Sequence, residues 1–162
     1  MIKRKIKSLV SLEKIRNGLK RKNKTVVFTN GCFDLLHYGH TRYLEQARTK
    51  GDILIVAVNS DKSVKKLKGP SRPILSQTER AGLIASLESV DYVVIFDALT
   101  PASVIKRLKP DILVKGADWK KKDIVGAKFI KTQGGKVSRI KLVGKYSSTQ
   151  LIRKIVKNNT KP

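Results

Sequence analysis

The stretch TVVFTNGCFDLLHYGH, Thr25–His40, decides the fold of this chain. Its first five residues, Thr25–Thr29, have the apolar and β-branched character of a buried strand. An Asn-Gly pair then allows a tight turn, and the only two histidines of the sequence, His37 and His40, follow it. A strand that leads through a glycine turn into a helical pattern predicts a strand–turn–helix unit.

Strand-like and helix-like segments alternate along the rest of the chain. The predicted strands are 25–29, 52–60, 91–96, 111–116 and 135–142, and the predicted helices are 11–22, 41–51, 80–89, 100–109 and 147–158. Ser11 is a candidate cap for the first helix, and Ser76–Glu79 forms a capping box before the third. Residues 61–75 read as irregular and basic. We therefore predict an α/β fold, a Rossmann-like doubly wound parallel sheet of about five strands with helices on both faces.

The length of 162 residues indicates a single domain with a real hydrophobic core. We divide the chain into a basic helical extension at 1–24, the α/β domain at 25–158 and a short tail at 159–162. Whether the extension packs on the domain is left open by the sequence.

The formal net charge of +24 is the strongest feature of the composition. It indicates a nucleic-acid-binding protein, an enzyme with polyanionic substrates, or simply a solvated lysine surface. The nine aromatic Phe, Tyr and Trp side chains are not interleaved with the lysines as a base-stacking surface would need. We therefore expect no specific nucleic-acid partner, and keep nucleic-acid binding as the alternative of another class.

The sequence also bears on the compartment. No apolar run approaches the roughly 18 residues that span a bilayer, and the basic N-terminus lacks the apolar core of a signal peptide. The single cysteine, Cys32, excludes an internal disulfide and reads most simply as a small buried side chain. We expect a cytoplasmic protein without a membrane partner.

The two histidines lie three residues apart, so on a first helical turn they share one face. Gly39 between them leaves space for a phosphate chain, and the helix N-terminus adds backbone donors. This arrangement predicts a triphosphate cradle. The alternatives are a pair of metal ligands, for which no third histidine or cysteine ligand is available, or two core histidines.

These residues also match a known pattern. G-x-F-D-x-x-H-x-G-H is filled by Gly31, Phe33, Asp34, His37, Gly39 and His40. In this the chain resembles the nucleotidyltransferase superfamily with the H-x-G-H motif, whose members are cytidylyltransferase-like. The serine-rich turn of YSSTQLIRKI, Tyr146–Ile155, is similar to a second superfamily element. The resemblance covers the chain from about Thr25 to Ile155 and makes 25–158 a nucleotidyltransferase domain.

Other segments, including AVNSD, LKGPSRP, VDYVVIF and KPDILVKGADW, resemble the adenylyltransferases of ADP-heptose synthesis. That family transfers AMP from ATP to D-glycero-β-D-manno-heptose 1-phosphate, for lipopolysaccharide core or other surface-glycan biosynthesis. The resemblance implies a homodimer and, since no kinase portion is present here, a heptose kinase on a separate chain.

The nearest alternatives are CTP-dependent transfer to glycerol 3-phosphate or phosphoethanolamine and ATP-dependent transfer to FMN or pantetheine phosphate. Glycerol-3-phosphate cytidylyltransferases carry an arginine before a G-I-S-T-T turn and an acidic pair in G-D-D-W. This chain has Leu142 and Gly144-Lys145 near the first position and Ala117-Asp118 at the second, which argues against cytosine recognition.

Motif positions and the resemblance together assign the site. The catalytic residues are His37, His40 and Arg80; the ATP-binding residues are Asn30, Gly31, Cys32, Phe33, Asp34, Gly39, Lys115, Gly116, Asp118, Ser147, Ser148 and Thr149; the sugar-phosphate residues are Asn59, Lys68 and Arg72. Mg²⁺ is expected to accompany the triphosphate, with few ligands from the protein. Asp34 either fixes the turn or helps to hold the magnesium-bound nucleotide.

Simpler readings remain for several of these residues. Ser148 and Thr149 could act only as a helix cap, and Lys68 could be a solvated loop residue. Arg80 could form a surface ion pair. Trp119 could stack on a base or sugar, or belong to the core or an interface.

Overall fold

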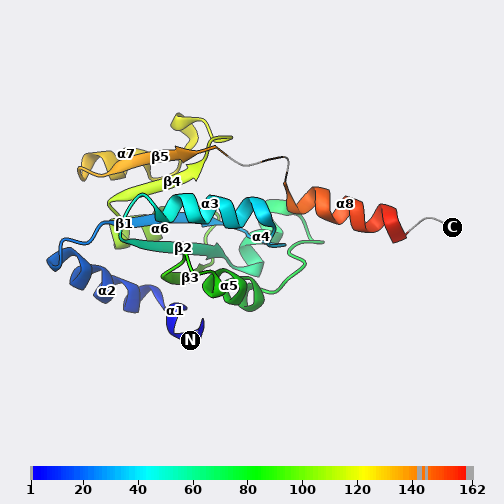
Figure 1. Cartoon of the computed structure of the whole chain (residues 1–162), viewed down its shortest axis with the longest axis horizontal. Helices are drawn as coiled ribbons and strands as arrows, with labels where there is room; N and C mark the ends of the chain where they lie inside the picture. The colour runs from blue at the N-terminus through cyan, green and yellow to red at the C-terminus, as the bar shows by residue number, and fades with distance from the viewer. Residues whose placement is uncertain (1, 142–143, 145, 160–162) are drawn as a thin grey trace.

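The computed structural model describes residues 2–141, 144 and 146–159. Five parallel strands form one sheet in the order β3-β2-β1-β4-β5 (Figure 1). The strands are β1 (Val26–Gly31), β2 (Ile53–Asn59), β3 (Tyr92–Phe96), β4 (Ile112–Gly116) and β5 (Lys136–Ile140). The predicted fold class is confirmed, and each predicted strand is present with its ends within two residues of the prediction.

Helices cover both faces of the sheet. They are α1 (Ile2–Lys5), α2 (Leu9–Arg21), α3 (Tyr38–Arg48), α4 (Asp61–Lys68), α5 (Gln77–Ser86), α6 (Ala102–Leu108), α7 (Ala127–Thr132) and α8 (Ser148–Asn159), with a 3₁₀ turn at Lys121–Asp123. One hydrophobic cluster joins α3 and α5 to the sheet. A second joins α2, α6 and α7 to the other face. Among the described residues no helix is both long and apolar enough to cross a bilayer.

Two local predictions were wrong, and one short helix was missed. Residues 61–68 form α4 instead of an irregular segment, because Ser60 caps the helix through Ser63 N and Val64 is fully buried beneath it. Ser8, not Ser11, caps α2, its side chain accepting a hydrogen bond from Ser11 N. The short helix α7 was missed, since only Ile130 of its six residues is buried and its sequence has little periodicity.

The N-terminal segment packs on the domain. Leu12 of α2 is fully buried in the second hydrophobic cluster. Ile6 forms a parallel bridge with Val93, and Lys7 N donates to Val93 O at 2.9 Å, which extends the sheet beside β3. Leu142 and Lys145, which bear on the cytosine argument, lie outside the described residues.

Aspartates at the amino edge of the sheet lock neighbouring strands together. Asp52, Asp91 and Asp111 each stand one residue before a strand, and their carboxylates accept hydrogen bonds from Thr25 N, Leu54 N and Val26 N at 2.7–2.8 Å. The backbone N–H of each aspartate donates in return to the carbonyl oxygen of the same residue, Thr25, Leu54 or Val26. The free first N–H groups at this edge are thereby satisfied.

The opposite edge is open where the strand order reverses. β1 pairs with β2 over six residues but with β4 over only two, Val27 with Ile112 and Phe28 with Leu113. Beyond these pairs β1 and β4 are no longer joined in register. Ligands of open α/β sheets bind in a crevice of this kind.

We predict that Asp111→Ala lowers the free energy of unfolding by about 2–3 kcal/mol. The substitution leaves the buried guanidinium of Arg16 without its carboxylate and the Val26 N–H without its acceptor. Arg16, which is 6% exposed, pairs with Asp111 at 2.8 Å. Urea denaturation measures the change. The matched control Asp52→Ala should lose less, because its partner Lys24 is half exposed. Equal losses in the two variants would contradict the role given to Arg16.

Candidate active site

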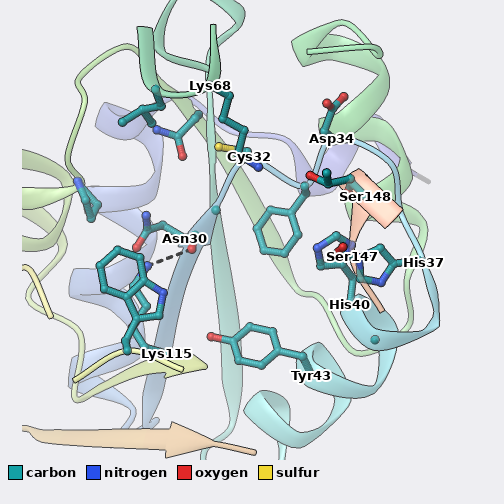
Figure 2. A pocket seen from close by; sticks show the side chains of 18 of the residues that line it. Asn30, Cys32, Asp34, His37, His40, Tyr43, Lys68, Lys115, Ser147 and Ser148 are labelled. Carbon is teal, nitrogen blue, oxygen red and sulfur yellow. Dashed lines mark hydrogen bonds between the residues drawn. The ribbon is translucent and has the colours of Figure 1, made fainter. Parts of the chain in front are cut away.

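A cavity of about 610 Å³ opens at the carboxyl ends of β1, β2 and β4, beside the start of α8 (Figure 2). Most of the residues predicted for the site line it: Asn30, Gly31, Cys32, Phe33, Asp34, His37, Gly39, His40, Asn59, Lys68, Lys115, Ser147, Ser148 and Thr149. Arg72, Arg80, Gly116 and Asp118 do not line it. The structure therefore brings most of the predicted residues together around one cavity.

The turn after β1 is built around a folded-back aromatic ring. Phe33 adopts a left-handed backbone conformation with φ of 46°. A Cβ atom on Gly31 would lie 3.0 Å from the Phe33 ring, so only glycine leaves room for it. The ring then meets the edge of the His40 imidazole, with centroids 5.2 Å apart. Gly31 thus serves the packing of Phe33, which in turn supports a histidine.

The two imidazoles stack on each other, with centroids 3.7 Å apart and an interplanar angle of 15°. Burial lowers the pKa of His37. Burial, with repulsion from His37 and Lys68, lowers the pKa of His40 to about 4. Both rings are therefore neutral at pH 7. Nδ1 of each ring is buried and makes no hydrogen bond of good geometry to a described residue, and contacts with the backbone of His37 and Leu35 partly oppose the lowering of the two pKa values.

Gly39 has a different role from the one predicted. A Cβ atom at this position would lie 3.0 Å from Tyr146 Cβ and 3.2 Å from the His37 ring. The space that glycine leaves is thus filled by protein and not kept for a phosphate chain. Gly39 allows the stacked histidine and the entry to α8 to approach α3.

Asp34 fixes the turn. Its side chain is buried, and Oδ1 accepts hydrogen bonds from Ile74 N at 2.7 Å and Leu75 N at 3.2 Å. Oδ2 lies 2.8 Å from Arg72 Nε, in an ion pair with little exposure on either side. Arg72 is thus committed to Asp34 and does not face the cavity as a sugar-phosphate ligand, which corrects that prediction.

Arg80 was predicted to be catalytic, and the structure corrects this as well. Its side chain is 0% exposed and lies beneath the cavity wall. It donates to Cys32 O, to Leu75 O at 3.0 Å and to Asp61 Oδ1 at 2.8 Å. A group enclosed in this way cannot touch a substrate, so Arg80 positions the turn and the segment before α5.

The start of α8 closes one side of the cavity. Ser147 Oγ accepts from Gln150 N at 3.1 Å as a helix cap. Ser148 Oγ donates to Leu35 O at 3.1 Å and receives a longer contact from Leu35 N, which ties α8 to the turn. Thr149 is exposed and lines the cavity with a side chain that has no such tie. The helix cap, which the sequence left open for Ser148 and Thr149, is thus provided by Ser147 instead.

At the end of β4, Lys115 reaches across to β1. Its Nζ donates to Asn30 O at 3.0 Å, the contact drawn as a dashed line in Figure 2, and lies 5.4 Å from the Trp119 ring centroid. Burial lowers the pKa of Lys115 to about 8, and the nearby carboxylate of Asp118 opposes the shift. Trp119 is 45% exposed and lines the cavity, so it does not belong to the core.

The side of the cavity near β2 is partly apolar. Asn59 is buried and donates to Ser63 Oγ at 2.9 Å, which fixes its amide. Lys68, at the end of α4, points toward the cavity in Figure 2. Leu67 and Leu99 are about half exposed beside it.

Sequence reasoning missed several lining residues: Tyr43, Leu67, Leu99, Thr100, Pro101, Val125 and Tyr146. The position of Thr100 and Pro101 directly after a predicted strand could have indicated them. Tyr43 carried no such signal, because its place on α3 reads as an ordinary core position; its hydroxyl lies 2.7 Å from Thr29 Oγ1.

The described residues contain no group of three or more His, Cys, Asp or Glu side chains that could hold a metal ion. The Asp34 carboxylate, which lines the cavity and could in principle bind a metal ion, already accepts hydrogen bonds from two backbone N–H groups and pairs with Arg72. The side chains present thus do not fit a resident magnesium site.

Residues 28–155 match the family model described as cytidylyltransferase-like. The bifunctional protein HldE of Syntrophotalea carbinolica is 49% identical over 152 residues, 94% of this chain and 31% of the relative. The bifunctional protein HldE of Campylobacter fetus subsp. fetus is 52% identical over 149 residues, 92% of this chain and 31% of the relative. The chain thus spans about a third of the length of the curated relatives that it matches.

Solved structures of other proteins share this fold. The lipopolysaccharide core biosynthesis protein from Thermoplasma volcanium GSS1 is 30% identical with a TM-score of 0.60, covering 76% of this chain and 99% of that one. Pantoate-beta-alanine ligase from Francisella tularensis, at 15% identity and a TM-score of 0.57, covers 97% and 79% and shows the fold alone. With its stacked H-x-G-H histidines at the carboxyl edge of a parallel sheet, this chain belongs to the cytidylyltransferase-like family.

Proposed function

We propose that the chain is a nucleotidyltransferase that transfers AMP from ATP to D-glycero-β-D-manno-heptose 1-phosphate, giving ADP-heptose and pyrophosphate. One observation supports the reaction type: two stacked neutral imidazoles, His37 and His40, line one cavity together with the N-terminus of α8. The similarity to the bifunctional HldE proteins and to a lipopolysaccharide core biosynthesis protein supports the proposed substrate.

The reaction would be one in-line displacement. A phosphate oxygen of the sugar 1-phosphate attacks the α-phosphorus of ATP, a new P–O bond forms, and the bond to the bridging oxygen of the β-phosphate breaks, so pyrophosphate leaves with the electron pair. The attacking phosphate is already ionised at neutral pH. The site therefore needs neither a general base nor a side-chain nucleophile, and its work is positioning and charge stabilisation.

In this account His37 and His40 donate hydrogen bonds to phosphate oxygens as charge builds on them. The N-terminus of α8, with Thr149 exposed on its first turn, would receive the β- and γ-phosphates. Lys68 and Asn59 also line the cavity and are proposed for the acceptor. Magnesium is proposed to enter with the triphosphate, whose charge it shields.

The acceptor must come from a reaction that attaches a phosphate to the anomeric carbon of a sugar. A sugar kinase catalyses a reaction of this class. The HldE relatives are bifunctional proteins, which fits a pairing of this activity with another. Whether the second activity acts from the same chain or from a separate one does not affect the chemistry proposed for this site.

The proposal is tested by pyrophosphate release with magnesium, crossing ATP and CTP against heptose 1-phosphate, glycerol 3-phosphate and FMN. We expect release only with ATP and heptose 1-phosphate. Release with CTP and glycerol 3-phosphate would overturn the substrate and keep the reaction type. Absence of release with every pair, from protein whose thermal unfolding is cooperative, would contradict the proposal as a whole.

We predict that His40→Ala lowers kcat/KM for ATP by about 100-fold, because one donor to the developing charge is lost. His37→Ala should have an effect of similar size. Steady-state kinetics measures both variants, with thermal unfolding to show that the fold is kept. Lys50→Ala, an exposed position beyond the far end of α3, is the control and should keep wild-type kinetics. Full activity of His40→Ala would exclude the phosphate-cradle role.

A further inference from the structure

One buried polar atom in the cavity has no part in the phosphate cradle. The side-chain oxygen Oδ1 of Asn30 is buried and has no hydrogen-bond partner in the described chain. Apart from Asp34 and Arg72, which face each other, only Arg16 and the two cradle histidines share this condition among the described side chains. Buried acceptors in folded proteins are nearly always paired, so a donor for Asn30 is expected from a ligand.

Lys115 contacts the backbone of the same residue from the other side of the strand reversal. Its Nζ uses one of three N–H bonds on Asn30 O, and its side chain is largely buried. The two residues come from β1 and β4, the neighbouring strands that stop pairing after Phe28 and Leu113. The crevice therefore contains two groups that can still form hydrogen bonds. Asn30 Oδ1 lacks a donor in the described chain, and Lys115 Nζ has further N–H bonds to donate.

The position of this pair within the cavity matters. Figure 2 shows Asn30 and Lys115 across the cavity from His37 and His40. Lys115 Nζ also lies 5.4 Å from the centroid of the half-exposed Trp119 ring. The pair thus lies across the cavity from the histidines and close to an aromatic ring. In a nucleotide the ribose lies between the phosphate chain and the base.

We infer that Asn30 and Lys115 clamp the vicinal hydroxyls of the nucleotide ribose, one hydroxyl donating to Asn30 Oδ1 and accepting from Lys115 Nζ. The inference rests on the proposed function, since it concerns the nucleotide of that reaction. A phosphate oxygen only accepts hydrogen bonds and cannot satisfy Asn30, whereas a hydroxyl both donates and accepts. Asn30 and Lys115 are on this account specificity-determining residues for ribonucleotides.

The test is calorimetric binding of ATP, 2′-deoxy-ATP and 3′-deoxy-ATP without acceptor, so that no turnover occurs. We expect wild-type protein to bind at least one deoxy analogue about tenfold more weakly than ATP. In Asn30→Ala and in Lys115→Met this discrimination should fall below about twofold, because the partner of the missing hydroxyl is gone. Asn30→Asp keeps an acceptor oxygen and should keep the discrimination, whatever its added charge does to affinity for all three nucleotides.

Matched controls change the same residue types on exposed positions of α2, Asn17→Ala and Lys14→Met, and should discriminate as wild type does. Equal binding of all three nucleotides by wild type would overturn the clamp and leave the ATP site standing. Discrimination that survives in both Asn30→Ala and Lys115→Met would overturn it too. Failure of wild type to bind ATP at all would overturn the clamp together with the proposed function.

Discussion

The buried carboxylate of Asp34 is the interaction on which the cavity depends. It lies in the turn after β1, and it holds the backbone of Ile74 and Leu75 and the guanidinium of Arg72 from a segment 40 residues further along the chain. Arg80 braces the same two segments from below through the Cys32 and Leu75 carbonyls. These contacts connect the turn to the segment before α5, and within the turn Phe33 packs against His40, which stacks on His37. The histidine pair at the start of α3 is thereby supported through the turn after β1.

The sheet supplies the second half of the site. Aspartates before β2, β3 and β4 satisfy its amino edge, while at the carboxyl edge β1 and β4 separate after two paired residues. The closed edge stabilises the fold, and the open edge is where we propose that the nucleotide binds. The high positive charge of the chain suits a polyanionic nucleotide, whose approach it would speed. This division places the phosphate cradle and the Asn30–Lys115 pair on opposite sides of one crevice.

The fold and the place of the site were predictable, because both rest on local signals. Alternation of strand and helix gave the parallel sheet, and the turn from Asn30 to His40 marked its ligand-binding edge. The roles of Arg72, Arg80 and Gly39 were not predictable in this way. Each depends on which distant residue fills the space around it: Asp34 for Arg72, the Cys32 and Leu75 carbonyls for Arg80, and Tyr146 for Gly39. The sequence alone does not distinguish an arginine that contacts a ligand from one that supports the residues lining the cavity.

The central claim is that two neutral stacked histidines receive the triphosphate, and nitrogen-15 NMR of the imidazoles tests it most directly. The chain has only two histidines, so the side-chain signals are few enough to assign with one single-site variant. The account predicts that both rings are neutral at pH 7, that His40 gains a proton only near pH 4, and that a non-hydrolysable ATP analogue shifts the ring nitrogens of both. Rings that are protonated at pH 7 in the free protein, or that do not respond to saturating nucleotide, would contradict it.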